Sequence, residues 1–151
     1  MIDEKSLEIL KILQEKARIP NVEVSRQVGL APSAVLERIR KLEKNGIIDG
    51  YEVRLNPEQF DKSQIAFIQI QTSCCGEDFD RIGECLSNLA ETQEVHYTTG
   101  DDGYFVKVRV KNAQELGQLI RNKIATISGI SSTRTITVMH TVKETSKIPI
   151  S

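Results

Sequence analysis

No stretch of the sequence is apolar over the length that a membrane-spanning helix needs. The 151 residues are 39% hydrophobic and 27% charged, which is the composition of a soluble globular protein. The N-terminus carries acidic residues and lacks the apolar block and cleavage site of a signal peptide. We therefore expect a cytoplasmic protein of one large domain or two small ones, with no membrane partner.

An excess of either charge is also missing. The net charge is −1, and residues 1–60 hold 10 Lys and Arg against 10 Asp and Glu. A broadly basic nucleic-acid binder is therefore not indicated, so any DNA contact must come from a local cluster of cations. Because such a cluster makes few phosphate contacts per copy, useful affinity requires several copies on one DNA.

Cysteine and histidine are scarce, and tryptophan is absent. The three cysteines, Cys74, Cys75 and Cys85, form no disulfide framework in a cytoplasmic chain, and we expect reduced thiols. Adjacent cysteines suit neither a zinc knuckle nor a Cys-x-x-Cys redox pair. A metal site that uses His96 or His140 is the alternative to two structural histidines. The sequence thus predicts no cofactor and no metal.

Residues 21–51 carry the pattern around which the rest of the chain is organised. Asn21 is predicted to cap a short helix, which Gly29 ends because glycine adopts left-handed backbone conformations at little cost. Pro32 suits the first position of a second helix, and an Asn-Gly pair stops it. Apolar residues recur at helical spacing in both helices: Val24 and Val28, then Val35, Ile39 and Leu42. Two helices joined by such a turn form a helix-turn-helix, whose second helix enters the major groove of DNA.

Polar side chains occupy the far side of this second helix. At 100° per residue they point broadly away from Val35, where they can donate to phosphates and to base edges. The predicted DNA-binding residues are Ser33, Glu37, Arg38, Arg40, Lys41, Lys44 and, in the segment that follows, Arg54. On the helix pattern alone, a solvated helix pair in a small α domain is the alternative.

The flanks of this pattern complete a first domain. Residues 3–17 are predicted to form a helix with Asp3 as its N-cap and an apolar stripe that covers the helix-turn-helix. Alternation over residues 51–55 predicts a β wing. We assign residues 1–55 to a winged helix-turn-helix domain, 56–62 to a hinge and 63–151 to a second domain.

The second half of the chain changes to an α+β pattern. Strands are expected over residues 64–72, 95–99, 104–110 and 130–142, and helices over residues 78–89 and 113–124. The order βαββαβ is that of the ferredoxin-like fold, a four-stranded antiparallel sheet with both helices on one face. In a chain this short, a second copy is expected to cover the other face, which predicts a homodimer.

Four motifs together resemble one protein family over nearly the whole chain: IDEKSLEILKILQEKARIP, VSRQVGLAPSAVLERIRKLEKNGII, TTGDDGYFVKVRV and GISSTRTITV. They resemble the leucine-responsive and asparagine-responsive (Lrp/AsnC, feast/famine) transcription regulators. The resemblance implies sequence-specific binding to double-stranded DNA by a homodimer, often assembled further to a tetramer or octamer. It also implies sensing of an amino acid, or a similar small metabolite, at interfaces between the ferredoxin-like domains.

The resemblance implies an effector site as well. Family members use the loop between the second and third strands, together with the last strand of a neighbouring subunit. In this sequence the implied effector-binding residues are Thr99, Gly100, Asp101, Asp102, Gly103, Tyr104, Thr133 and Thr135. The alternative, which has no binding role, is a type I′ hairpin turn at Asp102-Gly103 between two solvated strands.

Two departures from the family pattern bear on these expectations. Ala31 stands where members often have a serine that caps the recognition helix, so Pro32 or Ser33 must start the helix. Gly103 stands where members usually place an aspartate directly before the tyrosine. It is therefore open whether this sequence has the carboxylate with which family members bind an amine, since the nearest aspartate, Asp102, lies one position earlier.

Two other function classes remain open at this point. Siroheme decarboxylases resemble these regulators in fold, and His96 lies where a catalytic histidine would stand. However, the sequence has no Trp and only two His, and no catalytic triad, paired-carboxylate cleft or phosphate-binding glycine loop is recognisable, so we expect no enzyme. A ligand-sensing partner without DNA binding is the third class, and the cations of the second helix argue against it.

Overall fold

The computed structural model describes residues 1–73, 75–100 and 103–151 of the chain. The chain divides into two compact units. The helical unit comprises Met1–Arg54 together with Glu144–Ser151, and the sheet unit comprises Leu55–Lys143. The sequence placed all of residues 63–151 in the second domain, whereas residues 144–151 make their contacts with the helices.

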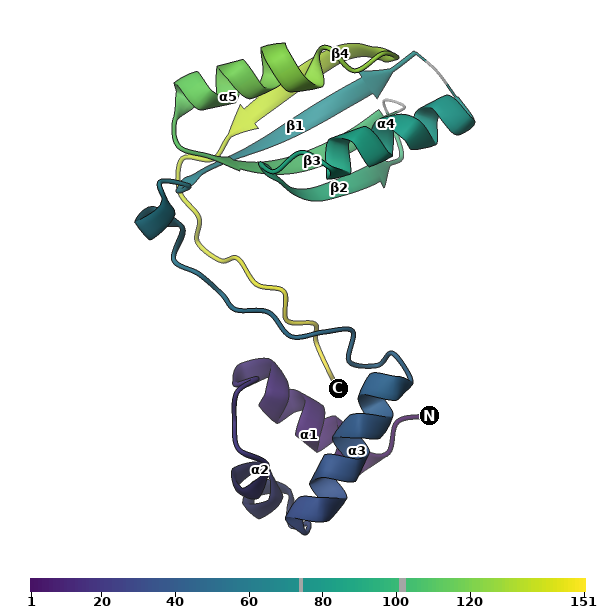
Figure 1. Cartoon of the computed structure of the whole chain (residues 1–151), viewed down its shortest axis with the longest axis vertical. Coiled ribbons are helices and arrows are strands. Elements are labelled where there is room, and N and C mark those ends of the chain that lie inside the picture. The colour runs from purple at the N-terminus through teal and green to yellow at the C-terminus, as the bar shows by residue number, and fades with distance from the viewer. Residues whose placement is uncertain (74, 101–102) are drawn as a thin grey trace. The chain divides into compact units, whose positions relative to one another are not determined.

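Three helices form the helical unit: α1 (Glu4–Glu15), α2 (Asn21–Val28) and α3 (Pro32–Lys44) (Figure 1). Asp3 caps α1 as predicted, because its carboxylate accepts a hydrogen bond from the Ser6 N–H at 3.0 Å. The predicted apolar positions meet in one core, whose buried members are Ile9, Val24, Val28, Val35 and Ile39. Burying one such branched side chain contributes about 1.5–3 kcal/mol, so this small unit depends on each of them.

The turn between α2 and α3 follows the sequence signals with one exception. Gly29 has φ 69°, the left-handed conformation, and its N–H closes α2 by donating to the Ser25 carbonyl at 3.0 Å. Pro32 is the first residue of α3, as predicted. Asn21 is no cap, because α2 already begins there and the preceding Pro20 carbonyl accepts the N–H of Val24. Neither Pro20 nor Ala31 offers a side-chain cap.

The predicted wing over residues 51–55 is wrong, since this segment forms neither helix nor strand. Strand geometry needs a ladder partner, and no described residue pairs with this segment. The segment is instead attached to α3 through Tyr51, whose hydroxyl donates to Glu43 Oε1 at 2.8 Å. Burial, followed by this hydrogen bond to a carboxylate, raises the pKa of Tyr51 to about 12.

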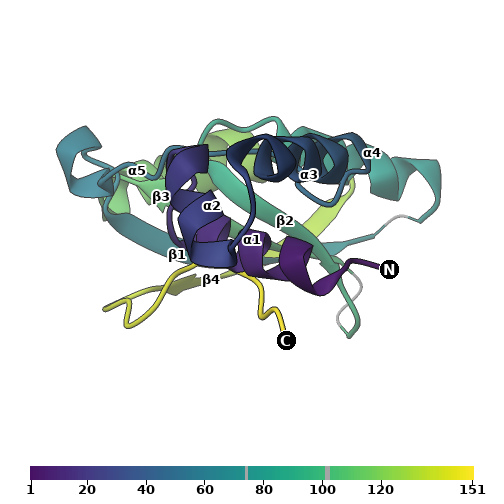
Figure 2. The ribbon, with the colours of Figure 1, turned by 90° about the horizontal axis from the view of Figure 1, so that it is seen from below.

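The sheet unit has the predicted βαββαβ order (Figures 1 and 2). After a short 3-10 turn, η1 (Pro57–Phe60), the elements are β1 (Gln64–Thr72), α4 (Glu77–Ser87), β2 (Thr92–Thr98), β3 (Gly103–Val110), α5 (Ala113–Leu119) with its π-helical end η2 (Ile120–Ile124), and β4 (Ile130–Thr137). Neighbouring strands pair antiparallel in the order β2-β3-β1-β4. Both views show α4 and α5 on the same face of the sheet, which is the ferredoxin-like arrangement.

The last strand is shorter than the predicted 130–142. Its pairing with β1 ends at Ala66↔Thr137, and the Val138 N–H donates a final bond to the Ile65 carbonyl at 2.9 Å. Because β1 begins at Gln64, later residues have no backbone on which to pair.

Alternation along the strands separates the two faces of the sheet. The helix-covered face carries the main core, with buried Ala66, Ile68, Ile70, Tyr104, Val106, Val108 and Val110 from the strands and Ile82, Leu86, Leu116, Leu119 and Ile124 from the helices. On the open face, the rings of Phe67 and Phe105 stack with centroids 5.5 Å apart, and Ile136 is 48% exposed. The aromatic pair and the exposed isoleucine thus form an apolar patch on the open face of the sheet.

Gly103 lies within the sheet and not in the turn that the sequence predicted at Asp102-Gly103. It is the first residue of β3 and pairs with Thr98 on one side and Gln71 on the other. A Cβ atom at this position would lie 1.7 Å from the Ile70 carbonyl oxygen, so only glycine fits the close approach of β3 to β1. Asp102 lies outside the described residues.

Candidate DNA and effector sites

The outward side of α3 presents three exposed cations. Arg40, Lys41 and Lys44 are exposed, and none of their side chains makes a hydrogen bond or ion pair with any residue that the structure describes. The polar residues Ser33 and Glu37 are exposed on the N-terminal half of the same helix. This arrangement places hydrogen-bonding groups near the start of the helix and positive charge toward its end. It is the combination that reads base edges and contacts phosphates.

Arg38 differs from its neighbours, because it is committed within the protein. Its Nη1 atom donates to Asp3 Oδ2 at 2.7 Å, to Asp3 Oδ1 at 2.8 Å and to the Ser6 hydroxyl at 3.2 Å. Asp3 therefore caps α1 and fastens α3 at the same time. The Ser6 N–H, then the Ser6 hydroxyl and Arg38, lower the pKa of the Asp3 carboxyl. Arg38, predicted to contact DNA, is instead a tie between two helices, whereas Arg54 is exposed in the segment after α3.

Tyr104 is part of the core and not of an open binding surface. It is 7% exposed, its ring stacks on Phe79 at a centroid distance of 4.6 Å, and its hydroxyl donates to the Phe79 carbonyl at 3.0 Å. The implied role of Tyr104 as an effector contact is therefore corrected to one of anchoring α4 on the sheet.

The other implied effector residues lie far apart within one sheet unit. Thr133 and Thr135 pair with Ile70 and Ile68, so their side chains belong to the helix-covered face. Thr99 follows β2 at the opposite edge of the sheet, three strand spacings or about 14 Å from β4. Thr99 and Gly100 are exposed, and Asp101 and Asp102 lie outside the described residues. Among the described residues, one sheet unit does not bring Thr99 and Gly100 next to Thr133 and Thr135.

Comparisons with known proteins also divide the chain into two parts. Residues 2–49 match a family model described as a winged helix-turn-helix DNA-binding domain, and residues 65–148 match the Lrp/AsnC ligand binding domain. The leucine-responsive regulatory protein of Escherichia coli (strain K12) is 37% identical over 150 residues, covering 99% of this chain and 92% of that protein. The chain belongs to the Lrp/AsnC family of transcription regulators.

Two solved structures share the fold. Escherichia coli AsnC is 31% identical with a TM-score of 0.89, and the match covers 99% of each chain. A transcriptional regulator of Neisseria meningitidis, solved as a complex with L-Met, is 25% identical with a TM-score of 0.93 over 99% of this chain and 97% of that one. The helical unit is thus the DNA-binding domain of a transcription regulator, and the comparisons do not favour the decarboxylase alternative.

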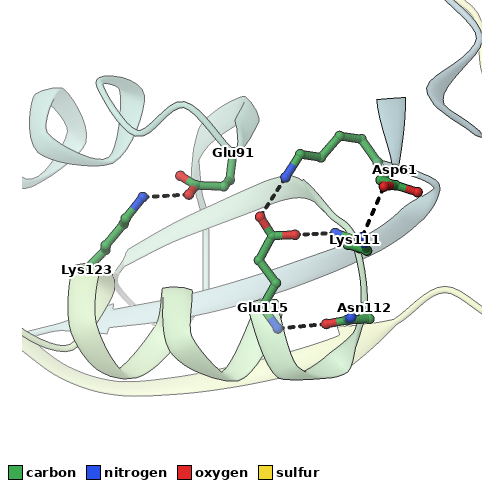
Figure 3. Close-up of polar contacts among 7 residues, drawn as sticks. Asp61, Glu91, Lys111, Asn112, Glu115 and Lys123 are labelled. Carbon is green, nitrogen blue, oxygen red and sulfur yellow. Dashed lines mark hydrogen bonds and ion pairs between the residues drawn. The ribbon is translucent and has the colours of Figure 1, made fainter. Parts of the chain in front are cut away.

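A polar network fixes the predicted hinge to the effector domain of this Lrp/AsnC chain (Figure 3). Lys62 donates to Glu115 Oε1 at 2.6 Å, and Lys111 Nζ donates to Asp61 Oδ2 at 3.0 Å. Asn112 caps α5 by accepting from the Glu115 N–H at 2.9 Å, while the Lys111 N–H donates to the Glu115 carboxylate. Lys62, then the Lys111 N–H, lower the pKa of Glu115. These contacts place residues 57–62 with the sheet unit, and no local sequence signal pointed to them.

The described histidine and cysteine side chains that were considered for metal or redox chemistry do not form a common site. His96 Nε2 lies 3.8 Å from Glu94 Oε1. Cys75 is exposed, Cys85 is half-buried, and Cys74 lies outside the described residues. Over the described ranges, no three His, Cys, Asp or Glu side chains come together as a metal site. Within those ranges, too, no helix combines the length and apolarity that crossing a membrane requires.

Proposed function

We propose that this Lrp/AsnC regulator binds operator DNA through α3 and responds to an amino acid, or a similar small metabolite, held between subunits in the cytoplasm. The observation that supports DNA contact is the set of exposed cations Arg40, Lys41 and Lys44 on α3, which pair with no residue that the structure describes. In this proposal, Ser33 and Glu37 face base edges, while the three cations and Arg54 contact phosphates.

The effector part of the proposal rests on the sheet topology and on the relatives. A sheet unit separates the loop after β2 from β4 by the width of the sheet, so a site that uses both needs two subunits. Acidic side chains of that loop can pair with the amine of a zwitterion through charge-assisted hydrogen bonds. The Neisseria meningitidis regulator, solved with L-Met, supports an amino-acid effector class.

We expect at least one of the twenty standard amino acids to raise the melting temperature of the wild-type chain, because a ligand that binds only the folded state stabilises it. Asp102→Ala is expected to weaken that binding at least tenfold in calorimetry, because the lost partner is a charged hydrogen-bond acceptor. Asp49→Ala, an exposed acidic residue of the helical unit, is the matched control. Equal binding to wild type and Asp102→Ala would reduce Asp102 to a turn residue, and an unresponsive wild type would exclude this ligand class.

The open face of the sheet is the proposed dimer interface. It carries the stacked pair Phe67 and Phe105 and the exposed Ile136, which a second copy of the same face would bury. Two-fold pairing brings two α3 helices to one DNA, which compensates for the few cations on each. Higher assembly to a tetramer or octamer is proposed from the family resemblance.

Ile136→Asp is expected to convert the dimer of the isolated sheet unit, residues 55–143, into a monomer at micromolar concentration. A charge placed in an apolar interface loses its hydration without gaining a partner. Thr137→Asp is the control, because Thr137 is the next residue of β4, is exposed and points to the other face. Sedimentation velocity distinguishes the states. A wild-type unit that sediments as a monomer would contradict dimerisation through this face.

A further inference from the structure

The chain that leaves β4 ends on the DNA-binding domain. The side-chain amide of Gln14, near the end of α1, makes two hydrogen bonds to the backbone of Ile148. Its Nε2 donates to the Ile148 carbonyl at 3.0 Å, and its Oε1 accepts from the Ile148 N–H at 2.9 Å. The adjacent Lys147 Nζ lies 2.8 Å from Glu15 Oε2. We call these four residues the clasp.

The clasp is held by polar contacts and fixes one register. The Ile148 side chain is 68% exposed, so its own apolar burial does not hold it in place. The Gln14 amide bonds both the N–H and the C=O of one residue, as a neighbouring strand does in a β-sheet. If the segment moved by one residue along α1, both hydrogen bonds would be lost. The Thr145 hydroxyl accepts from the Lys147 N–H at 3.1 Å and shapes the approach. Solvent-exposed contacts of this kind are individually weak, so the clasp opens and closes readily.

The clasp also changes how the two units are connected. The chain passes between them twice, once at Arg54–Leu55 and again at Lys143–Glu144. The second passage starts at a fixed point, because the Val138 N–H is bonded to the Ile65 carbonyl of β1. Lys147 is nine residue steps after Val138, and an extended chain of that length spans at most about 32 Å. The closed clasp therefore gives the chain a second attachment between the two units.

We propose that residues 139–151 act as a strap that fastens the effector domain to the DNA-binding domain. With the clasp closed, two chain segments connect the helical unit to the sheet unit and restrict its motion. The two α3 helices of a dimer then keep a fixed spacing when they meet DNA. With the clasp open, one linker remains and each helical unit samples more orientations. Because the strap continues directly from β4, a change at that strand reaches α1 through the backbone. The DNA part of the proposal rests on the proposed dimer, whereas the clasp itself lies within one chain.

The first test releases the clasp and measures mobility by 15N relaxation of the full chain. Gln14→Ala is expected to lower the order parameters of residues 144–151 below about 0.6 and to shorten the separate correlation time of the helical unit. Lys11→Ala is the control, since Lys11 is exposed on the same helix and makes no side-chain hydrogen bond or ion pair with any described residue. Unchanged order parameters in Gln14→Ala would overturn the clasp.

Charge exchange tests the ion pair independently. Glu15→Lys and Lys147→Glu are each expected to mobilise residues 144–151, and combining the two substitutions is expected to restore the order parameters. Lys143→Glu, which makes the same charge change outside the clasp, is expected to leave them unaltered. If the combined variant remains as mobile as the single ones, the Lys147–Glu15 pair is not part of the clasp.

The last measurement asks whether the strap matters for DNA. For a selected duplex with two half-sites, Gln14→Ala is expected to lower affinity about tenfold. Once one α3 helix is bound, the more mobile second α3 helix has a lower effective concentration at the second half-site. A duplex with one half-site is expected to bind both proteins equally. A mobile strap with unchanged tumbling and unchanged two-site affinity would overturn the proposal. If the wild type fails to dimerise, the proposed function is contradicted. The relaxation data would still show whether residues 144–151 are held by the clasp, because they are measured within one chain.

Discussion

Replacing Arg40 and Lys41 together with alanine is expected to weaken DNA binding on the order of a hundredfold at physiological salt. Both side chains are exposed on α3 and unpaired among the described residues, so each is available to displace a counterion from a phosphate. Each lost phosphate contact also reduces the slope of log affinity against log salt by about 0.9. A dimer that loses two contacts per chain therefore becomes weaker and markedly less salt-sensitive.

Titration of operator DNA at several salt concentrations measures both quantities. Lys11→Ala combined with Arg18→Ala is the matched control, because it removes one Lys and one Arg from exposed positions of the same domain away from α3. That control is expected to change neither affinity nor slope appreciably. Circular dichroism should show that both double variants stay folded. If the α3 variant binds with the affinity and slope of wild type, α3 does not lie against the DNA backbone.

Arg38 is left out of this design for a structural reason. Its guanidinium is bound to Asp3 and Ser6, so its removal breaks the tie between α1 and α3 and weakens the fold together with any DNA contact. A loss of DNA binding in an Arg38 variant would therefore not identify a DNA contact.

Gly103→Ala is expected to destabilise the sheet unit by about 2–3 kcal/mol, the cost of overpacking a closely packed site. The added Cβ would lie 1.7 Å from the Ile70 carbonyl oxygen, and the neighbouring atoms are backbone, which cannot rotate away as a side chain can. Either β3 or β1 must move, and the hydrogen bonds between them are strained.

The matched control is Gly117→Ala. Gly117 lies inside α5, and a Cβ atom there would have nothing within 4 Å, so alanine is expected to stabilise the protein by about 0.5–1 kcal/mol. Chemical denaturation followed by circular dichroism gives both values. If Gly103→Ala is as stable as wild type, β3 does not approach β1 this closely. An altered response to the effector in a stable Gly103→Ala protein would instead locate its effect in the loop.

The sequence by itself determined the order and type of nearly every element. Asp3 as a cap, Gly29 as a helix end and Pro32 as a helix start are local signals, because each depends on the conformations open to one residue and its near neighbours. Hydrophobic spacing then separated three helices from a βαββαβ half. Spacing also placed Arg40 and Lys41 away from the core, since the 3.6-residue period fixes which side of a helix each residue occupies.

The tertiary structure decided which residues meet, because contacts between distant residues leave no periodic trace in the sequence. Arg38 is taken by Asp3, 35 positions away, and Gln14 meets Ile148, 134 positions away. Residues 51–55 alternate like a strand yet form none, because a strand exists only where another strand pairs with it. Strand order and register, likewise invisible locally, turned Tyr104, Thr133 and Thr135 toward the helices and left Gly103 pressed against Ile70.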